Sequence, residues 1–229
     1  MIGSLIYIII IVLIIYLILK FVKKLISMIF SFILLFLVIS FILVSFVYMD
    51  FSDLKENITN QTSIIILKDD IKPITGAYVI FNESFDFETK KLIENIGQSN
   101  LNNKKQILNK SYKLFIFDIK FLEENLPNNL YFNNITLSKN AIINILISED
   151  PLLEFSSSIN IQKDQIALSK NELKFNLFHI TLNEITQNKN IGPVIKGYKN
   201  KQITIYRETI AFKFMKILPS AYINNYFTN

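Results

Sequence analysis

The sequence predicts an α+β protein in which an N-terminal transmembrane helical hairpin precedes one mixed α/β extracytoplasmic domain. Two observations lead to this prediction. Apolar residues dominate the first 48 of the 229 residues, where the only charges are Lys20, Lys23 and Lys24. From residue 49 onward, strand-like and helix-like segments follow one another without the regular βαβ alternation of a doubly wound sheet.

The predicted anchor, residues 1–48, contains two uncharged apolar runs at residues 2–19 and 25–48. As helices these runs would be about 27 and 36 Å long, against a hydrocarbon core of about 30 Å. We therefore expect two spans joined by a Lys-rich turn at residues 20–24. A cleaved signal peptide fits poorly, because the chain start is uncharged and residues 21–24 are not a small-residue cleavage site. One span with an interfacial helix, or one long bent helix, stays open because no glycine or proline lies near the turn.

The lysines of the turn predict how the anchor is oriented. Short Lys-rich loops stay in the cytoplasm, which would place both chain ends outside. After the second run, Asp50, Asp53 and Glu56 outnumber Lys55, so the basic flank of a cytoplasmic domain is missing. We expect a multi-pass cell-membrane protein, and an inverted topology is the alternative. Neither run has an Asp, Glu, His, Lys or Arg in its interior, which argues against a transporter.

The domain is expected over residues 63–229, after a juxtamembrane linker at residues 49–62. The patterns predict strands at residues 63–68, 77–81, 113–119 and 202–206, and helices at residues 85–96, 139–147, 170–186 and 208–218. Ser138 is a candidate N-cap, and Ser169 with Glu172 forms a capping box. The alternation within residues 173–177 leaves a strand possible there.

Other segments are predicted from turn and loop chemistry. Asp69-Asp70 and Pro73 indicate a turn that makes a hairpin of the first two strands, whereas residues 99–109 and 154–165 are rich in Asn and Ser and are expected to be loops.

The last predicted helix carries an apolar stripe made of Ile210, Phe214 and Ile217, with Lys213 and Lys216 off it. Pro219 ends this helix. The tail beyond it contains three aromatic residues, Tyr222, Tyr226 and Phe227. We expect the tail to pack on its own domain, with a partner or the lipid interface as the alternative.

Composition excludes several classes of function. Arg207 is the only arginine, and three of the 24 basic residues lie in the anchor, so the domain is nearly neutral and no nucleic-acid partner is expected. The chain has no cysteine, which excludes disulfides, thiolate nucleophiles and cysteine metal sites. It has five glycines and no phosphate-binding loop, so we expect no nucleotide and no cofactor.

Four polar features are candidate sites, and none is predicted to be catalytic, cofactor-binding or metal-binding. His179 is the only histidine and has no carboxylate four residues away. Asp69-Asp70 and Glu149-Asp150 lie near prolines and are expected in turns or at helix ends. Ser156, Ser157 and Ser158 are expected in a flexible loop. Five Asn-X-Ser/Thr sequons agree with an outer domain: Asn57, Asn60, Asn82, Asn109 and Asn134.

Several stretches can be compared with known proteins: MDFSDLKEN, SIIILKDD, YKLFIFDIK, ITLSKNAIINILISEDPL and ITIYRETIAFKFMKILP. They resemble stretches of uncharacterised small membrane-anchored proteins of reduced-genome archaea. The resemblance implies an anchored extracytoplasmic domain, and it brings no site residues.

The absence of catalytic motifs predicts a non-enzymatic envelope protein. Its partners would be the lipid bilayer and another envelope protein or a second copy of itself. The alternative is a membrane-anchored hydrolase with a dispersed site of Ser, Lys or carboxylate side chains, because such a site leaves no local motif.

Overall fold

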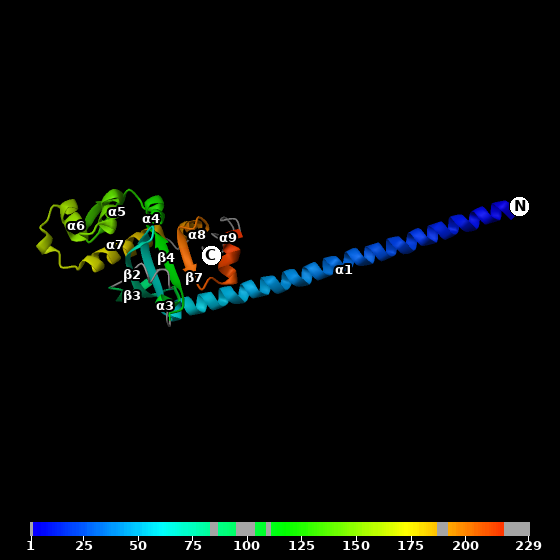
Figure 1. The fold of residues 1–229 in the computed structure, drawn as a ribbon, viewed down its shortest axis with the longest axis horizontal. Helices are drawn as coiled ribbons and strands as arrows, with labels where there is room; N and C mark the ends of the chain where they lie inside the picture. Colours follow the sequence, from blue (N-terminus) through cyan, green and yellow to red (C-terminus); the bar gives the residue numbers. More distant parts are fainter. Residues whose placement is uncertain (1, 83–86, 95–103, 109–110, 187–191, 218–229) are drawn as a thin grey trace. The chain divides into compact units, whose positions relative to one another are not determined.

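The computed structural model describes residues 2–82, 87–94, 104–108, 111–186 and 192–217 (Figure 1). The chain divides into two compact units, Met1–Met49 and Asp50–Asn229. The boundary falls where the apolar run ends, next to the predicted end of the anchor at residue 48. The sequon at Asn109, Pro219 and the aromatic tail lie outside the described residues.

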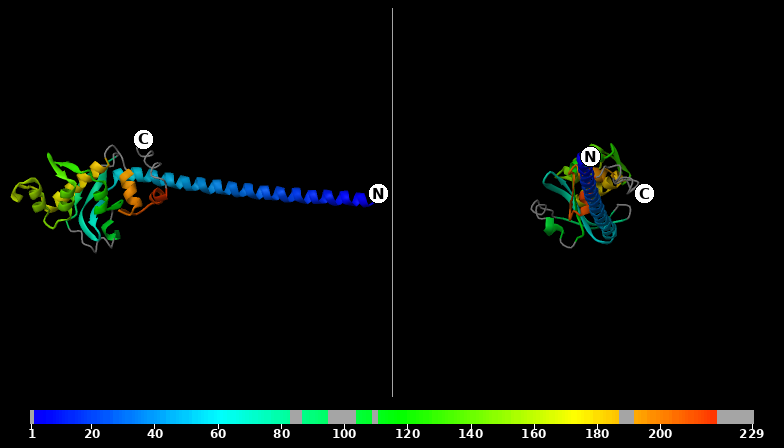
Figure 2. Two further views of the ribbon diagram at one scale, coloured as in Figure 1. Left: turned by 90° about the horizontal axis from the view of Figure 1, so that it is seen from above. Right: turned by 90° about the vertical axis from the view of Figure 1, so that its right-hand side faces the viewer.

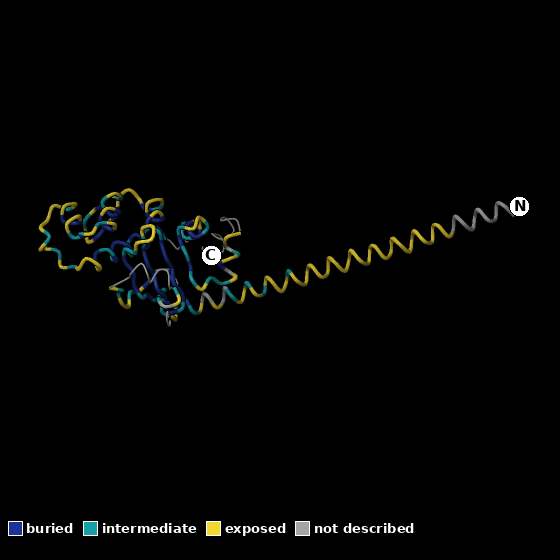
Figure 3. The backbone as a smooth tube through the Cα atoms, viewed as in Figure 1, coloured by how far each residue is buried: buried dark blue, intermediate teal, exposed yellow. Residues whose placement is uncertain are grey.

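The first unit is helical throughout its described length and belongs to α1 (Ile2–Asn60). From Leu13 to Met49 no side chain is buried, as the exposed colour along this helix shows (Figure 3). Leu13–Asp50 is the one helix among the described residues that is long and apolar enough to cross a membrane, and the same features suit a signal sequence near the N-terminus.

The predicted two-helix hairpin is not confirmed. Residues 20–24, expected as a turn, are helical, and so are residues 49–60 of the expected linker. The physical reason is local: without glycine or proline near the lysines, nothing interrupts the hydrogen bonds between residues i and i−4.

The second unit is built on a mixed five-stranded sheet, shown with its helices in Figures 1 and 2. The strand order is β3-β2-β1-β4-β7. The strands are β1 (Ser63–Asp69), β2 (Lys72–Phe81), β3 (Phe87–Leu92), β4 (Leu114–Asp118) and β7 (Ile203–Tyr206). The central pair, β1 and β4, is parallel, and every other neighbouring pair is antiparallel. This mixture confirms the α+β class.

The sheet buries both of its faces, because alternate residues of the central strands point to opposite sides. Ile65 and Leu67 belong to the main core, which also takes in helix side chains. Ile64 and Ile66 belong to a smaller core with Leu108 of the short helix α3 (Lys104–Leu108). All four isoleucine and leucine side chains of β1 are fully buried, which explains its continuous apolar run.

The remaining elements follow β4. They are α4 (Ile119–Asn125), β5 (Asn129–Phe132), β6 (Ile135–Ser138), α5 (Lys139–Ile147), α6 (Pro151–Ile159), η1 (Lys163–Gln165), α7 (Lys170–Ile185), α8 (Gly192–Lys199) and α9 (Ile210–Ile217). β5 and β6 form a separate hairpin whose turn residues Asn133 and Asn134 both have positive φ. Two such residues suit the tight turn of a two-residue hairpin, a signal that sequence reasoning missed.

Local signals placed several elements correctly. The predicted 63–81 hairpin, the strands at 113–119 and 202–206, and the helices at 139–147, 170–186 and 208–218 are all present as β1–β2, β4, β7, α5, α7 and α9. The Ser138 hydroxyl accepts from the backbone N–H of Ala141, and the Ser169–Glu172 capping box is complete. Caps determine helix starts because they satisfy otherwise unpaired N–H groups.

Three predicted elements were wrong. Residues 99–109, expected as a loop, contain the short helix α3 (Lys104–Leu108). Residues 85–96, expected as a helix, contain strand β3, because Phe87 packs into the main core and the segment pairs with β2. Residues 154–165, expected as a loop, contain most of α6 and η1. Pro151 occupies the first turn of α6, where its missing N–H costs nothing, and Phe155 anchors the helix in the core.

Candidate functional site

The carboxyl ends of the two parallel strands carry the first candidate site. Lys68 of β1 and Asp118 of β4 are register partners, and the Lys68 Nζ lies 2.9 Å from the Asp118 Oδ2. Their side chains are 25% and 16% exposed, so the ion pair is largely shielded. Ligand sites of open α/β sheets lie at this edge, so the position of the pair makes it a candidate ligand site.

The contacts of Asp118 indicate a structural role for its side chain. Its Oδ1 accepts from the Lys120 backbone N–H at 3.1 Å, which caps α4, while its Oδ2 accepts from Lys68. Its own backbone N–H donates to the Gln202 carbonyl at 2.8 Å. Both carboxylate oxygens are therefore engaged. Sequence reasoning weighed Asp69-Asp70 and missed this pair, although an Asp between a strand and a helix is itself an N-cap signal.

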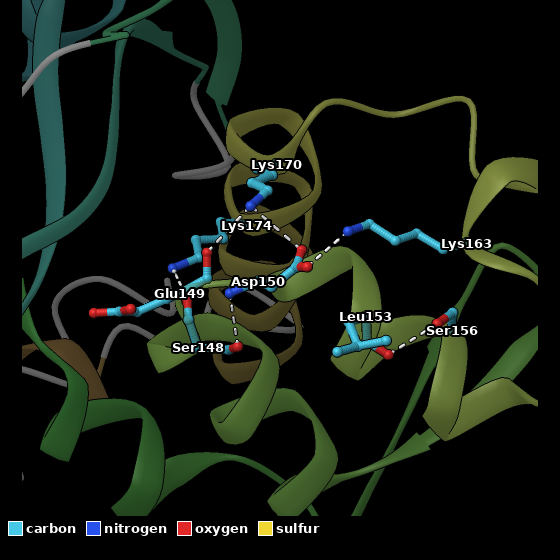
Figure 4. A network of polar contacts seen from close by, with 8 residues as sticks. All are labelled: Ser148, Glu149, Asp150, Leu153, Ser156, Lys163, Lys170 and Lys174. Atoms are coloured by element: carbon cyan, nitrogen blue, oxygen red, sulfur yellow. Dashed lines mark hydrogen bonds and ion pairs between the residues drawn. The ribbon is translucent and has the colours of Figure 1, made fainter.

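A second polar cluster gathers where α5 ends, α6 begins and α7 begins, as Figure 4 shows. The Asp150 carboxylate accepts from the Lys163 Nζ at 2.6 Å and lies 3.4 Å from the Lys170 Nζ. The Lys174 Nζ donates to the Ser148 carbonyl at 2.7 Å, and the Lys72 Nζ lies 3.7 Å from Glu149. We call these residues the lysine cluster; its members are Lys72, Ser148, Glu149, Asp150, Lys163, Lys170 and Lys174.

Charge and burial shift two pKa values in the lysine cluster. The hydrogen bond from Lys163 lowers the pKa of Asp150, partial desolvation opposes it, and the hydrogen bond from Lys170 lowers it further. Burial lowers the pKa of Lys174, and the charges of Lys72 and Lys170 lower it again. A lysine with a lowered pKa is a candidate general base beside a serine.

The geometry of Ser148 does not assemble such a pair. The Lys174 Nζ donates a hydrogen bond to the backbone carbonyl of Ser148 and not to its hydroxyl. The Ser148 hydroxyl accepts a hydrogen bond from the Asp150 backbone N–H at 3.0 Å. Among the described contacts, the lysine cluster instead ties the end of α5 to the starts of α6 and α7. No observation here favours the hydrolase alternative.

A third cluster surrounds Lys113, which is only 2% exposed. Its Nζ donates to the Arg207 carbonyl at 3.1 Å and lies 4.6 Å from the centre of the Tyr112 ring. The Tyr112 hydroxyl donates to the Asp53 Oδ2 at 3.2 Å. Burial lowers the pKa of Lys113, and the nearby charges of Asp50 and Asp53 oppose that change. Burial, aided by Asp53, raises the pKa of Tyr112.

His179 is held by aromatic packing. Its ring centroid lies 4.3 Å from that of Phe87 and 6.4 Å from that of Phe175. Its Nε2 lies 3.2 Å from the Asn183 side-chain nitrogen. The predicted role of a packed helix histidine fits these contacts.

The remaining candidates occupy structural positions. Asp70 has φ 49° in the tight β1–β2 turn. The hydroxyl of Ser156 lies within α6 and donates to the Leu153 carbonyl at 2.9 Å, which corrects the expected flexible serine loop (Figure 4). Of the sequons, Asn57 and Asn60 lie in α1 and Asn134 in the β5–β6 turn.

No group of three or more His, Asp or Glu side chains placed to hold a metal ion occurs within the described ranges. Comparison with protein-family models, with curated proteins and with solved structures gave no match. The three polar clusters are therefore interpreted from their own geometry.

Proposed function

We propose that this chain is a membrane-anchored envelope protein whose outer α+β domain serves protein interaction. One observation carries the proposal: an apolar helix with no buried side chain from Leu13 to Met49 precedes a domain that has its own core. An exposed apolar surface of this size is unfavourable in water and favourable in a bilayer. The described polar clusters hold helices and strands of this domain together.

We further propose that the apolar helix crosses the bilayer twice. Residues 2–48 in one straight helix would be about 70 Å long, more than twice the hydrocarbon thickness of about 30 Å. A single crossing would leave about half of these apolar residues in water. The structure has continuous helix at Lys20, Lys23 and Lys24, so two crossings require the helix to open into a turn there in the membrane. Such a turn would put both halves in lipid and the lysines at the surface, and lysines in a short loop favour the cytoplasmic side.

Single-cysteine labelling tests this topology, because the chain has no cysteine of its own. Lys23→Cys reports on the turn, and Ser157→Cys reports on the exposed surface of α6. With a membrane-impermeant maleimide, we expect Ser157→Cys to react in intact cells and Lys23→Cys only after permeabilisation. Reaction of both in intact cells would overturn the two-span model. Protection of Ser157→Cys in intact cells, with labelling after permeabilisation, would place the domain in the cytoplasm.

The interaction role is tested separately. Chemical crosslinking of intact membranes, followed by purification of the full chain in detergent, should recover a stoichiometric partner or a self-oligomer. A partnerless, monodisperse monomer from crosslinked membranes would contradict the proposal. The topology result does not depend on this outcome.

A further inference from the structure

The apolar stripe of α9 faces away from its own domain. Ile210, Phe214 and Ile217 share one face because they are spaced i, i+4 and i+7. Ile210 is 48% exposed, Ile217 is 78% exposed, and Phe214 is half-buried. Phe212, on the opposite face, is the buried anchor of the helix at 8% exposure.

Contacts on its other side hold α9 in this orientation. The ring centroid of Phe212 lies 5.9 Å from that of Tyr198 in α8. The Lys216 Nζ lies 4.6 Å from the centre of the Tyr198 ring and is hydrogen bonded to Glu208, which also accepts from the Tyr198 hydroxyl. With these groups engaged, turning the stripe inward would break the packing of Phe212 and the contacts of Lys216.

The packing of α9 also places it beside the residues that follow the apolar run in the sequence. The Lys113 Nζ lies 5.3 Å from the centre of the Phe212 ring and interacts with the charges of Asp50 and Asp53. Asp50 comes directly after Met49, the last residue of the apolar unit. In a membrane-anchored chain, Asp50 lies at the lipid surface, and α9 therefore lies close to that surface.

We propose that α9 is an interfacial helix whose stripe, Ile210, Phe214 and Ile217, enters the boundary between lipid headgroups and acyl chains. This inference rests on the proposed membrane anchoring. Helices that lie in the interface combine an apolar face with flanking basic residues, and Lys213 is exposed beside the stripe. In this proposal the eight residues of α9 give the domain a membrane contact of its own in addition to the anchor.

The test uses the full chain in vesicles of phosphatidylcholine with phosphatidylglycerol, labelled with an environment-sensitive fluorophore at one introduced cysteine. Ile217→Cys reports on the stripe and Phe36→Cys on the anchor. Leu153→Cys is the matched control, since Leu153 is an apolar side chain 53% exposed on α6. We expect lipids spin-labelled near the headgroup to quench the probe at 217, deeply labelled lipids to quench it at 36, and neither to quench it at 153.

The outcomes separate the two proposals. Quenching at 36 without quenching at 217 would overturn the interfacial role and leave the anchor intact, whereas no quenching at either position would overturn both. A probe at 217 that is unquenched and becomes solvent-exposed when residues 218–229 are deleted would assign the stripe to the tail. If the probe at 217 is unquenched and its fluorescence falls when the protein is diluted among more vesicles, the stripe contacts a second copy of the chain instead of lipid.

A further check uses two substitutions. Ile210→Ser should lower the quenching at 217, whereas Tyr131→Ser, on β5, should not.

Discussion

Lys113 is a buried cation that holds together the start of β4, the residue after β7 and the domain end of α1. Lys113→Ala leaves the Arg207 carbonyl without its donor and opens a cavity, so we expect the free energy of unfolding to fall by about 2–4 kcal/mol. Lys113→Met keeps the volume of the stem and should cost about half as much. Denaturant unfolding of the detergent-solubilised chain measures both.

The control for Lys113 is Lys120→Ala, because the Lys120 side chain is exposed and surface changes of this kind stay within about 0.5 kcal/mol. Equal effects at the two positions would show that the burial of Lys113 contributes nothing to stability.

Asp150 makes the stability of the domain depend on pH. Its pKa is held below the ordinary value of 3.8 by Lys163 and Lys170, so the folded state binds its proton less readily than the unfolded state. The stabilisation is present above pH 3.8 and is lost as the pH falls through the lower, folded pKa. We expect the gap in unfolding midpoint between the wild type and Asp150→Asn to be widest near neutral pH and to shrink below pH 3.8.

Asp164→Asn is the matched control for this pH effect, since Asp164 is an exposed acid in the neighbouring η1. A gap for Asp150→Asn that stays constant from pH 7 to pH 3 would contradict the role assigned to the two lysines.

At the scale of elements, Gly197 allows α8 to approach α4 and β7. A Cβ at this position would lie 2.6 Å from the Phe121 Cδ2 and 3.1 Å from the Ile203 Cδ1, and both neighbours are buried. We expect Gly197→Ala to lower the free energy of unfolding by about 1–3 kcal/mol through overpacking.

A double-mutant cycle checks the cause. Phe121→Leu removes ring atoms from the contact, so Gly197→Ala should cost less in that background than in the wild type. Purely additive effects on the free energy of unfolding would mean that the cost of Gly197→Ala does not come from the close contact with Phe121.

The helices and strands also show which local sequence signals predict an element correctly in the folded domain. The caps at Ser138 and Ser169 placed α5 and α7, because a cap acts within four residues of its own helix. β3 was mistaken for a helix, because its pairing with β2 and the packing of Phe87 are not encoded by local spacing. The stripe of α9 was recognised, but its outward direction depends on Phe212 and Tyr198 from the rest of the fold.

At the scale of the whole molecule, the described core of the second unit includes no residue of the first unit. Its buried residues run from Ile58 to Phe212, and none of the described core residues lies before residue 50. We therefore expect residues 50–229 alone to fold. Near-ultraviolet circular dichroism of the fragment should show a tertiary signal, and its unfolding midpoint should stay close to that of the detergent-solubilised full chain.

Lys113→Ala in the same fragment is the negative control, because it should lower the midpoint as it does in the full chain. A fragment with helical signal but no tertiary signal would show that the second unit depends on residues before 50.

The sequence by itself determined the apolar N-terminal segment, the α+β class and the starts of α5 and α7, because hydropathy and helix caps act over a few residues. Only the tertiary structure decided the strand order, the parallel pairing of β1 with β4, and the meeting of Lys68 with Asp118 and of Lys113 with Arg207. These contacts join residues 50 and 94 positions apart. Their formation depends on how separate elements bury their apolar faces together, which no local pattern specifies.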